Sequence, residues 1–289
     1  MPRFEERRWT SGDGLNLFFR DYAGTGGEAR LPLICLHGLT RNSKDFEDVA
    51  PLLAERTKRR VLVPDMRGRG RSDRDPDPAH YEPRTYAHDV LALMDALGIP
   101  RAQILGTSMG GIIAMVLASL RPKAVAGAIL NDVGPAIGPE GLARILGYAG
   151  TDPAVGSWED AADFVRRINQ VAFPDYTDAD WSLFAKRTFR EGKQGPELDY
   201  DPAIAGALKA PSRVASAAAW LMFRRLARKR PTLLVRGATS DIVTGDIARR
   251  MKRYAPGLRL AEVPNVGHAP TLVEPVAIAA IEQFLSDVA

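Results

Sequence analysis

The chain has 289 residues and a net charge of +4, and 45% of its residues are hydrophobic while 26% are charged. These values are typical of a globular protein with a sizeable core. The single cysteine, Cys35, excludes an internal disulfide. We find no apolar run long enough to span a membrane and no leader-like segment, so we expect a cytoplasmic protein without a membrane partner.

The basic excess is spread over several short stretches rather than gathered in one. The strongest is FRRLARKR at 223–230. A solvated helix end explains this stretch better than a nucleic-acid surface does, because a basic patch alone is weak evidence for binding. We therefore expect no nucleic-acid partner.

Apolar runs alternate with helical patterns through most of the chain. The runs that predict strands lie at 15–22, 31–38, 59–65, 101–107, 125–133, 231–238 and 258–265. Helical spacing is found at 43–56, 84–98, 109–120, 244–254 and 275–288. The first strand has the pattern of an edge strand, and the others are continuously apolar. Such alternation predicts a mostly parallel sheet with helices on both faces.

The alternation stops between about Gly134 and Pro211. This stretch has no strong strand signal and carries helical segments at 141–150, 158–173 and 178–192. The sequence therefore predicts a core formed by 1–133 and 212–289. A helical cap, 134–211, is expected to cover the carboxyl edge of the core's sheet.

The stretch ILGTSMGGIIA at 104–114 surrounds one serine with glycines and apolar residues. It is typical of a strand, a sharp turn and a helix, and Gly106–Gly110 fits the pattern G-x-S-x-G. In such an elbow the glycines make room where strand and helix approach, and the serine is presented above a helix N-terminus. The pattern indicates that Ser108 is a nucleophile.

A serine hydroxyl needs a base to react at neutral pH. In elbow enzymes the partners follow the serine in the order acid, then histidine. Of the four histidines only His268 lies after Ser108, in the loop NVGHAP. We therefore predict that His268 is the base.

The acid that orients the histidine has two candidates, each at the end of an expected strand. Asp241 follows the strand at 231–238, one helix and one strand before His268. Asp132 ends the strand at 125–133, where it could instead cap the start of the cap segment. We predict Asp241 as the acid and keep Asp132 as its rival.

An oxyanion needs two preorganised N–H donors. Met109 follows the nucleophile, and Leu39 follows the His37-Gly38 turn at the end of a strand. We expect their backbone N–H groups to form the oxyanion hole. His37 is expected mainly to hold its loop, and Arg41 to brace a loop or to reach a substrate carboxylate.

The glycine-rich stretch DMRGRGRSD at 65–73 lacks the spacing of a phosphate-binding loop, so we reject nucleotide binding. Its glycines indicate a tight turn. Arg67, Ser72 and Asp73 are expected to brace the loops of the core.

Five motifs together resemble the α/β-hydrolase superfamily: LHGL at 36–39, DMRGRGRS at 65–72, GTSMGG at 106–111, RGATSDIVT at 236–244 and VGH at 266–268. The resemblance covers nearly all of the chain outside the cap. It implies an eight-stranded, mostly parallel sheet, a helical cap inserted after strand six, and a Ser108–His268–Asp241 triad. It implies no metal and no organic cofactor.

The resemblance favours the branch of esterases and enol-lactonases. We expect cleavage of an ester or lactone of a small-to-medium hydrophobic molecule through an acyl-enzyme. Carbon–carbon bond hydrolysis is the alternative, and a small-molecule receptor on a hydrolase scaffold is the alternative of another class. Oligomeric state is left open. Possible substrate contacts are His37, Arg41, Trp158, Phe173, Trp181 and Phe184.

Overall fold

The computed structural model describes residues 4–25, 30–151, 153, 155–207 and 212–288. Within these residues, eight strands form one sheet in the order β1-β2-β4-β3-β5-β6-β9-β10. Apart from the antiparallel pairs β1–β2 and β2–β4, neighbouring strands are parallel. The sheet strands are Glu5–Thr10, Asn16–Tyr22, Leu33–Leu36, Val61–Pro64, Ala102–Thr107, Val125–Asn131, Thr232–Gly237 and Arg259–Val263.

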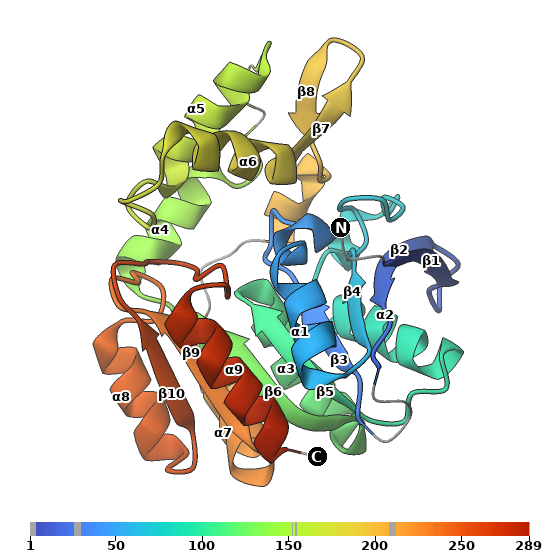
Figure 1. Ribbon diagram of the computed structural model, residues 1–289, viewed down its shortest axis with the longest axis vertical. Helices are drawn as coiled ribbons and strands as arrows, with labels where there is room; N and C mark the ends of the chain where they lie inside the picture. Colours follow the sequence, from blue (N-terminus) through green and yellow to red (C-terminus); the bar gives the residue numbers. More distant parts are fainter. Residues whose placement is uncertain (1–3, 26–29, 152, 154, 208–211, 289) are drawn as a thin grey trace.

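Helices cover both faces of the sheet (Figure 1). α2, α3, α7 and α8 contribute to one apolar cluster, while α1 and α9 contribute to the cluster on the opposite face. Their bounds are Val49–Thr57 (α1), Pro83–Ala96 (α2), Met109–Leu120 (α3), Arg213–Lys229 (α7), Gly245–Tyr254 (α8) and Pro275–Asp287 (α9). The predicted parallel sheet with helices on both faces is confirmed.

The first predicted strand does not lie at the edge of the sheet. β2 is nearly all buried and pairs with β4 on one side and β1 on the other. β1, with the sequence EERRWT, is the true edge strand and is largely exposed. Its charges hide the strand pattern, because only Trp9 needs to face the core.

Between β6 and β9 the chain leaves the sheet and forms the inserted segment, residues 134–207 as described. It contains α4 (Pro139–Tyr148), α5 (Trp158–Asn169), α6 (Asp178–Thr188), β7 (Phe189–Gly192) and β8 (Gly195–Leu198). These elements lie beyond one end of the sheet strands (Figure 1). The expected boundary at Pro211 falls outside the described residues.

The inserted segment is not wholly helical, which corrects the expectation for 134–211. β7 and β8 form an antiparallel hairpin with a two-residue turn, and residues 189–192 are strand rather than the end of a helix. Phe189 and Leu198 face each other in this hairpin and are both buried. A glycine at each end of the turn and four-residue strands leave too few residues for a strand pattern in the sequence.

The turn after β4 is held by buried ion pairs, as expected for Arg67. The guanidinium of Arg67 is almost fully buried and bonds to three carboxylates: Asp13, Asp75 and Asp89. Asp89 lies on α2, so the network joins the turn to a core helix.

No described helix has the length and apolar character required to cross a bilayer.

Candidate active site

Ser108 lies at a sharp turn between β5 and α3. Its backbone has φ 51° and ψ −116°, a region that few non-glycine residues adopt. The turn places Ser108 directly before the first residue of α3, where backbone N–H groups have no partner inside the helix. The hydroxyl is thereby presented at the carboxyl edge of the sheet, as the elbow pattern predicts.

The glycines of the elbow have a steric reason. A Cβ on Gly106 would lie 2.3 Å from the backbone carbon of Gly110, and one on Gly110 would lie 2.0 Å from the carbonyl oxygen of Leu36. Both clashes are with backbone atoms, which cannot rotate away. Small residues therefore surround the serine because strand and helix pack too closely for a side chain.

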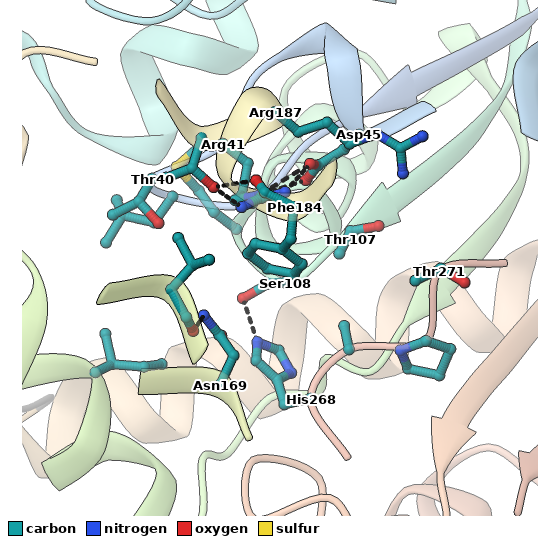
Figure 2. A pocket seen from close by; sticks show the side chains of 18 of the residues that line it. Thr40, Arg41, Asp45, Thr107, Ser108, Asn169, Phe184, Arg187, His268 and Thr271 are labelled. Atoms are coloured by element: carbon teal, nitrogen blue, oxygen red, sulfur yellow. Dashed lines mark hydrogen bonds and ion pairs between the residues drawn. The ribbon is translucent and has the colours of Figure 1, made fainter. Parts of the chain in front are cut away.

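A chain of two hydrogen bonds joins Ser108, His268 and Asp132. The Ser108 hydroxyl lies 3.0 Å from Nε2 of His268, a contact that Figure 2 draws. Nδ1 of the same ring lies 2.8 Å from Oδ2 of Asp132. An ionised carboxylate only accepts, so Nδ1 carries the hydrogen and Nε2 is free to accept from the serine.

Asp132 is fully buried and held on every side. Its Oδ1 accepts from the N–H of Gly237 at 3.1 Å, and its Oδ2 accepts from the Ser240 hydroxyl at 2.5 Å as well as from His268. Its own N–H donates to the carbonyl of Val235, and its φ is 49°. The carboxylate is therefore fixed by the loop after β9 and aimed at His268.

The structure contradicts the prediction that Asp241 is the acid, because Asp241 makes no hydrogen bond to His268 among the described residues. Asp241 receives two hydrogen bonds from Arg144 of α4, both at 2.8 Å. Burial raises the pKa of Asp241, while the hydrogen bond and the charge of the Arg144 guanidinium lower it. The lowering effects together outweigh burial, so the pKa lies below its ordinary value. Asp132, the rival candidate, occupies the position beside the histidine.

The two backbone N–H groups expected to form the oxyanion hole have no backbone partner among the described residues. Met109 begins α3, so its N–H has no intrahelical partner. The N–H of Leu39 takes part in no backbone hydrogen bond among the described residues. Leu39 follows Gly38, where an added Cβ would lie 3.8 Å from Cβ of Ser108. The oxyanion hole expected from Leu39 and Met109 agrees with this placement and stays a prediction.

His37 holds its loop from a fully buried position. Its Nε2 accepts from the N–H of Met66 at 3.1 Å, so Nδ1 carries the hydrogen and donates to the carbonyl of Gly38 at 2.8 Å. Burial lowers the pKa of His37 to about 4, which keeps the ring neutral. His37 is not part of the cavity wall, which corrects the expectation that it could contact a substrate.

A cavity of about 640 Å³ lies above Ser108 and His268. Core loops form one side of it, and the inserted segment forms the other. Its apolar wall from the inserted segment includes Ile137, Leu142, Ile145, Val165, Ile168 and Phe184. This volume lies within the range of small-molecule sites.

Three of the predicted substrate contacts lie on the cavity wall: Arg41, Phe173 and Phe184. Arg41 binds Asp45 and packs its guanidinium 4.1 Å from the centre of the Phe184 ring. Ser108 lies between this pair and His268 (Figure 2). The two tryptophans do not line the cavity. Trp181 is buried among the aromatic rings of the inserted segment, and Trp158 donates to Glu191.

Several polar residues on the cavity wall carry no motif, so sequence reasoning did not find them. Arg144 and Tyr148 lie on α4, Asn169 ends α5, and Arg187 lies near the end of α6. Asn169 lines the same cavity as Ser108 and His268 and is labelled with them in Figure 2. Only the apolar spacing of the helices could have indicated which of their faces turns toward the sheet.

One group of possible metal ligands occurs among the described residues: Asp13, Asp75 and His80. Asp13 lies in the turn between β1 and β2, and Asp75 and His80 lie in the loop after β4. None of the three lines the cavity. Arg67 bonds to both carboxylates, so their oxygens already have a cationic partner. This cluster is therefore explained as part of the Arg67 network.

The fold and the site define a class of proteins with a serine at an elbow, a histidine base and a buried acid. The model of the α/β-hydrolase fold family matches residues 32–275. A solved structure of an α/β hydrolase from Novosphingobium aromaticivorans is 44% identical, has a TM-score of 0.91 and is matched over the whole of both chains. The chain belongs to the α/β-hydrolase family.

Two curated relatives differ in the compounds for which they are named. A 3-hydroxybutyrate-oligomer hydrolase from Cupriavidus necator is 36% identical over 262 residues, 88% of each chain. A 2-(acetamidomethylene)succinate hydrolase from Mesorhizobium japonicum is 25% identical and covers 88% of this chain and 87% of its own. The two relatives are thus named for different substrates.

Proposed function

We propose that the protein hydrolyses a small-to-medium carboxylic ester or lactone through an acyl-enzyme on Ser108. The observation that carries this proposal is the chain of hydrogen bonds from Ser108 through His268 to the buried Asp132. It gives the hydroxyl a base and gives the base a fixed tautomer.

The first half of the reaction forms the acyl-enzyme. Ser108 Oγ attacks the carbonyl carbon while Nε2 of His268 takes its proton. The N–H groups of Leu39 and Met109 stabilise the oxyanion, and Asp132 stabilises the imidazolium. The tetrahedral intermediate then breaks its bond to the alcohol oxygen, which receives the proton from His268.

Water completes the cycle. It enters the space that the alcohol leaves, gives its proton to His268 and attacks the acyl carbon. The second tetrahedral intermediate releases the carboxylic acid and restores the Ser108 hydroxyl. No metal or cofactor is needed for either half.

The relative from Cupriavidus necator supports ester chemistry, because the bonds that join hydroxybutyrate units are carboxylic esters. The apolar wall of the cavity supports a substrate with a short or medium hydrocarbon part. Both observations bear on the class of bond and the size of the substrate.

The test is turnover of p-nitrophenyl butyrate by the wild-type protein and by Ser108→Ala and His268→Ala variants. We expect turnover in the wild type and a loss of at least about 10³-fold in kcat in each variant. His88→Ala is the matched control, because His88 is exposed on α2 and away from the cavity. It should keep wild-type turnover.

A folded wild-type protein that turns over no ester or lactone would overturn the proposal. Ligand binding without turnover would then indicate a receptor, and cleavage of a vinylogous diketone would indicate carbon–carbon hydrolysis. A covalent acyl adduct on Ser108, detected by mass spectrometry after rapid quenching, would support the acyl-enzyme directly.

A further inference from the structure

Three arginines lie on the cavity wall among the described residues: Arg41, Arg144 and Arg187. Arg41 pairs with Asp45 and Arg187 with Asp48, and both of those carboxylates also line the cavity. Arg144 differs, because its partner Asp241 is not among the lining residues. Arg144 therefore lines the cavity, while its counter-ion Asp241 does not.

The hydrogen bonds of Arg144 leave one edge of the guanidinium open. Its Nε and Nη2 donate to the two oxygens of Asp241. Nη1 has no hydrogen-bond partner among the described residues, and the side chain keeps 19% of its surface exposed. A guanidinium has five N–H donors, so both donors of Nη1 and one of Nη2 stay available as a fork.

The surroundings of Arg144 add a further donor. Tyr148 lies one turn along α4, lines the cavity and is within electrostatic range of both Arg144 and Arg41. Its hydroxyl makes no hydrogen bond to any described residue. A phenol and an open guanidinium fork together suit an anionic oxygen of a ligand.

The position of Arg144 indicates which half of an ester substrate it would contact. Asp241, which holds Arg144, directly follows Ser240, and the Ser240 hydroxyl donates to the same Asp132 oxygen as His268 does. Arg41, by contrast, lies on the other side of Ser108, near Gly38 and the expected oxyanion hole. His268 protonates the departing alcohol, so the alcohol half of the substrate lies on the His268 side, where Arg144 is.

From this geometry we infer that Arg144 binds a carboxylate on the alcohol half of the substrate, so that the enzyme prefers esters whose leaving alcohol is a hydroxy acid. This inference rests on the proposed function. Arg144 acts here as a residue that sets specificity, and its ion pair with Asp241 holds the guanidinium in place. The ester bond is cleaved as described above, and the product alcohol leaves with its carboxylate still ionised.

The test compares two substrates with the same scissile ester. One is 3-butyryloxybutyrate, and the other is 3-butyryloxybutyramide, in which a neutral amide replaces the carboxylate and keeps its carbonyl. Release of butyrate gives kcat and KM for each. We expect the wild type to prefer the acid in kcat/KM, and Arg144→Gln to lower kcat/KM for the acid by about 10- to 100-fold, mostly through KM. The amide should change by less than about threefold.

Asp241→Asn separates binding from a structural role. It removes the charge of the partner but keeps a side-chain oxygen that can accept one of the two hydrogen bonds of Arg144, so the guanidinium stays in position. It also removes a carboxylate that competes for the guanidinium. We expect the preference for the acid to be kept or raised in this variant. Arg187→Gln, which changes a different cavity arginine, should leave the ratio of the two substrates at its wild-type value.

Three results would overturn the inference. The wild type could show no preference for the acid, Arg144→Gln could lower both substrates equally, or Asp241→Asn could lose the preference as Arg144→Gln does. The last two would make the pair a structural clamp only. Turnover of p-nitrophenyl butyrate that depends on Ser108 would still support the proposed function, so the two failures are distinguishable.

Discussion

At the scale of single residues, two aspartates compete for one role. Asp132 and Asp241 lie in the loops after β6 and β9, which are neighbours in the sheet, so both lie at the same edge. Order along the chain cannot choose between them. In the structure, Asp132 has a positive φ and its carboxylate bonds to Nδ1 of His268, while Asp241 is paired with Arg144.

The roles of the two aspartates can be tested by replacing each with asparagine. Asp132→Asn should lower kcat on p-nitrophenyl butyrate by about 10³- to 10⁴-fold, because an amide N–H beside Nδ1 favours the wrong tautomer of His268. Asp241→Asn should lower kcat by less than about tenfold, since its carboxylate bonds to Arg144 and not to His268.

Steady-state kinetics with both folded variants decides this point. Equal losses of kcat would contradict the assignment of Asp132. A larger loss in Asp241→Asn would restore the acid that the sequence predicts.

At the scale of elements, patterns that arise from backbone packing can be predicted from the sequence, and those that depend on distant partners cannot. The predicted helix at 109–120 has the same bounds as α3, since its apolar run and the glycine clashes are local properties. β1 and the β7–β8 hairpin have no such signal. Their residues become strand through pairing with other strands, and charged or very short strands show no alternation.

The turn after β4 offers a test of an element held by buried charge. Arg67→Met should lower the free energy of unfolding by about 3–5 kcal/mol, because it leaves Asp75 and Asp89 buried without their cation. Arg71→Met, in the same turn, is the control. It removes an exposed pair with Glu6 and should cost less than about 1 kcal/mol.

Chemical denaturation followed by circular dichroism measures both changes. Equal effects of the two substitutions would show that the Arg67 network contributes no more than a surface ion pair.

At the scale of the whole molecule, the core supplies the serine, histidine and acid, and the inserted segment supplies much of the cavity wall. Short motifs of the core therefore suffice to predict that the serine and the histidine lie together, but not which aspartate bonds to the histidine. They do not predict the shape of the cavity, because it depends on how α4, α5 and α6 pack over the sheet edge and on side chains such as Asn169 that no motif marks.

The size of the cavity should limit the length of the acyl group. Across p-nitrophenyl acetate, butyrate, octanoate and palmitate, we expect kcat/KM to rise to butyrate or octanoate and to fall for palmitate, because an extended sixteen-carbon chain is long for a cavity of about 640 Å³. Assays below the micelle concentration of each ester check this expectation. An undiminished rate with palmitate would mean that the inserted segment opens widely.

The loop after β9 has a different task because the acid lies one strand earlier. Asp241 bonds to Arg144 and not to His268, and the start of α4 packs directly on it: a Cβ on Gly138 would lie 2.1 Å from its carbonyl oxygen, and the Gly138 N–H donates to the carbonyl of Ile242. The loop after β9 thus holds the start of the inserted segment against the core. Ser240 of the same loop donates to Asp132, so only positions that face α4, such as Asp241, could change which substrates are accepted without disturbing the partner of His268.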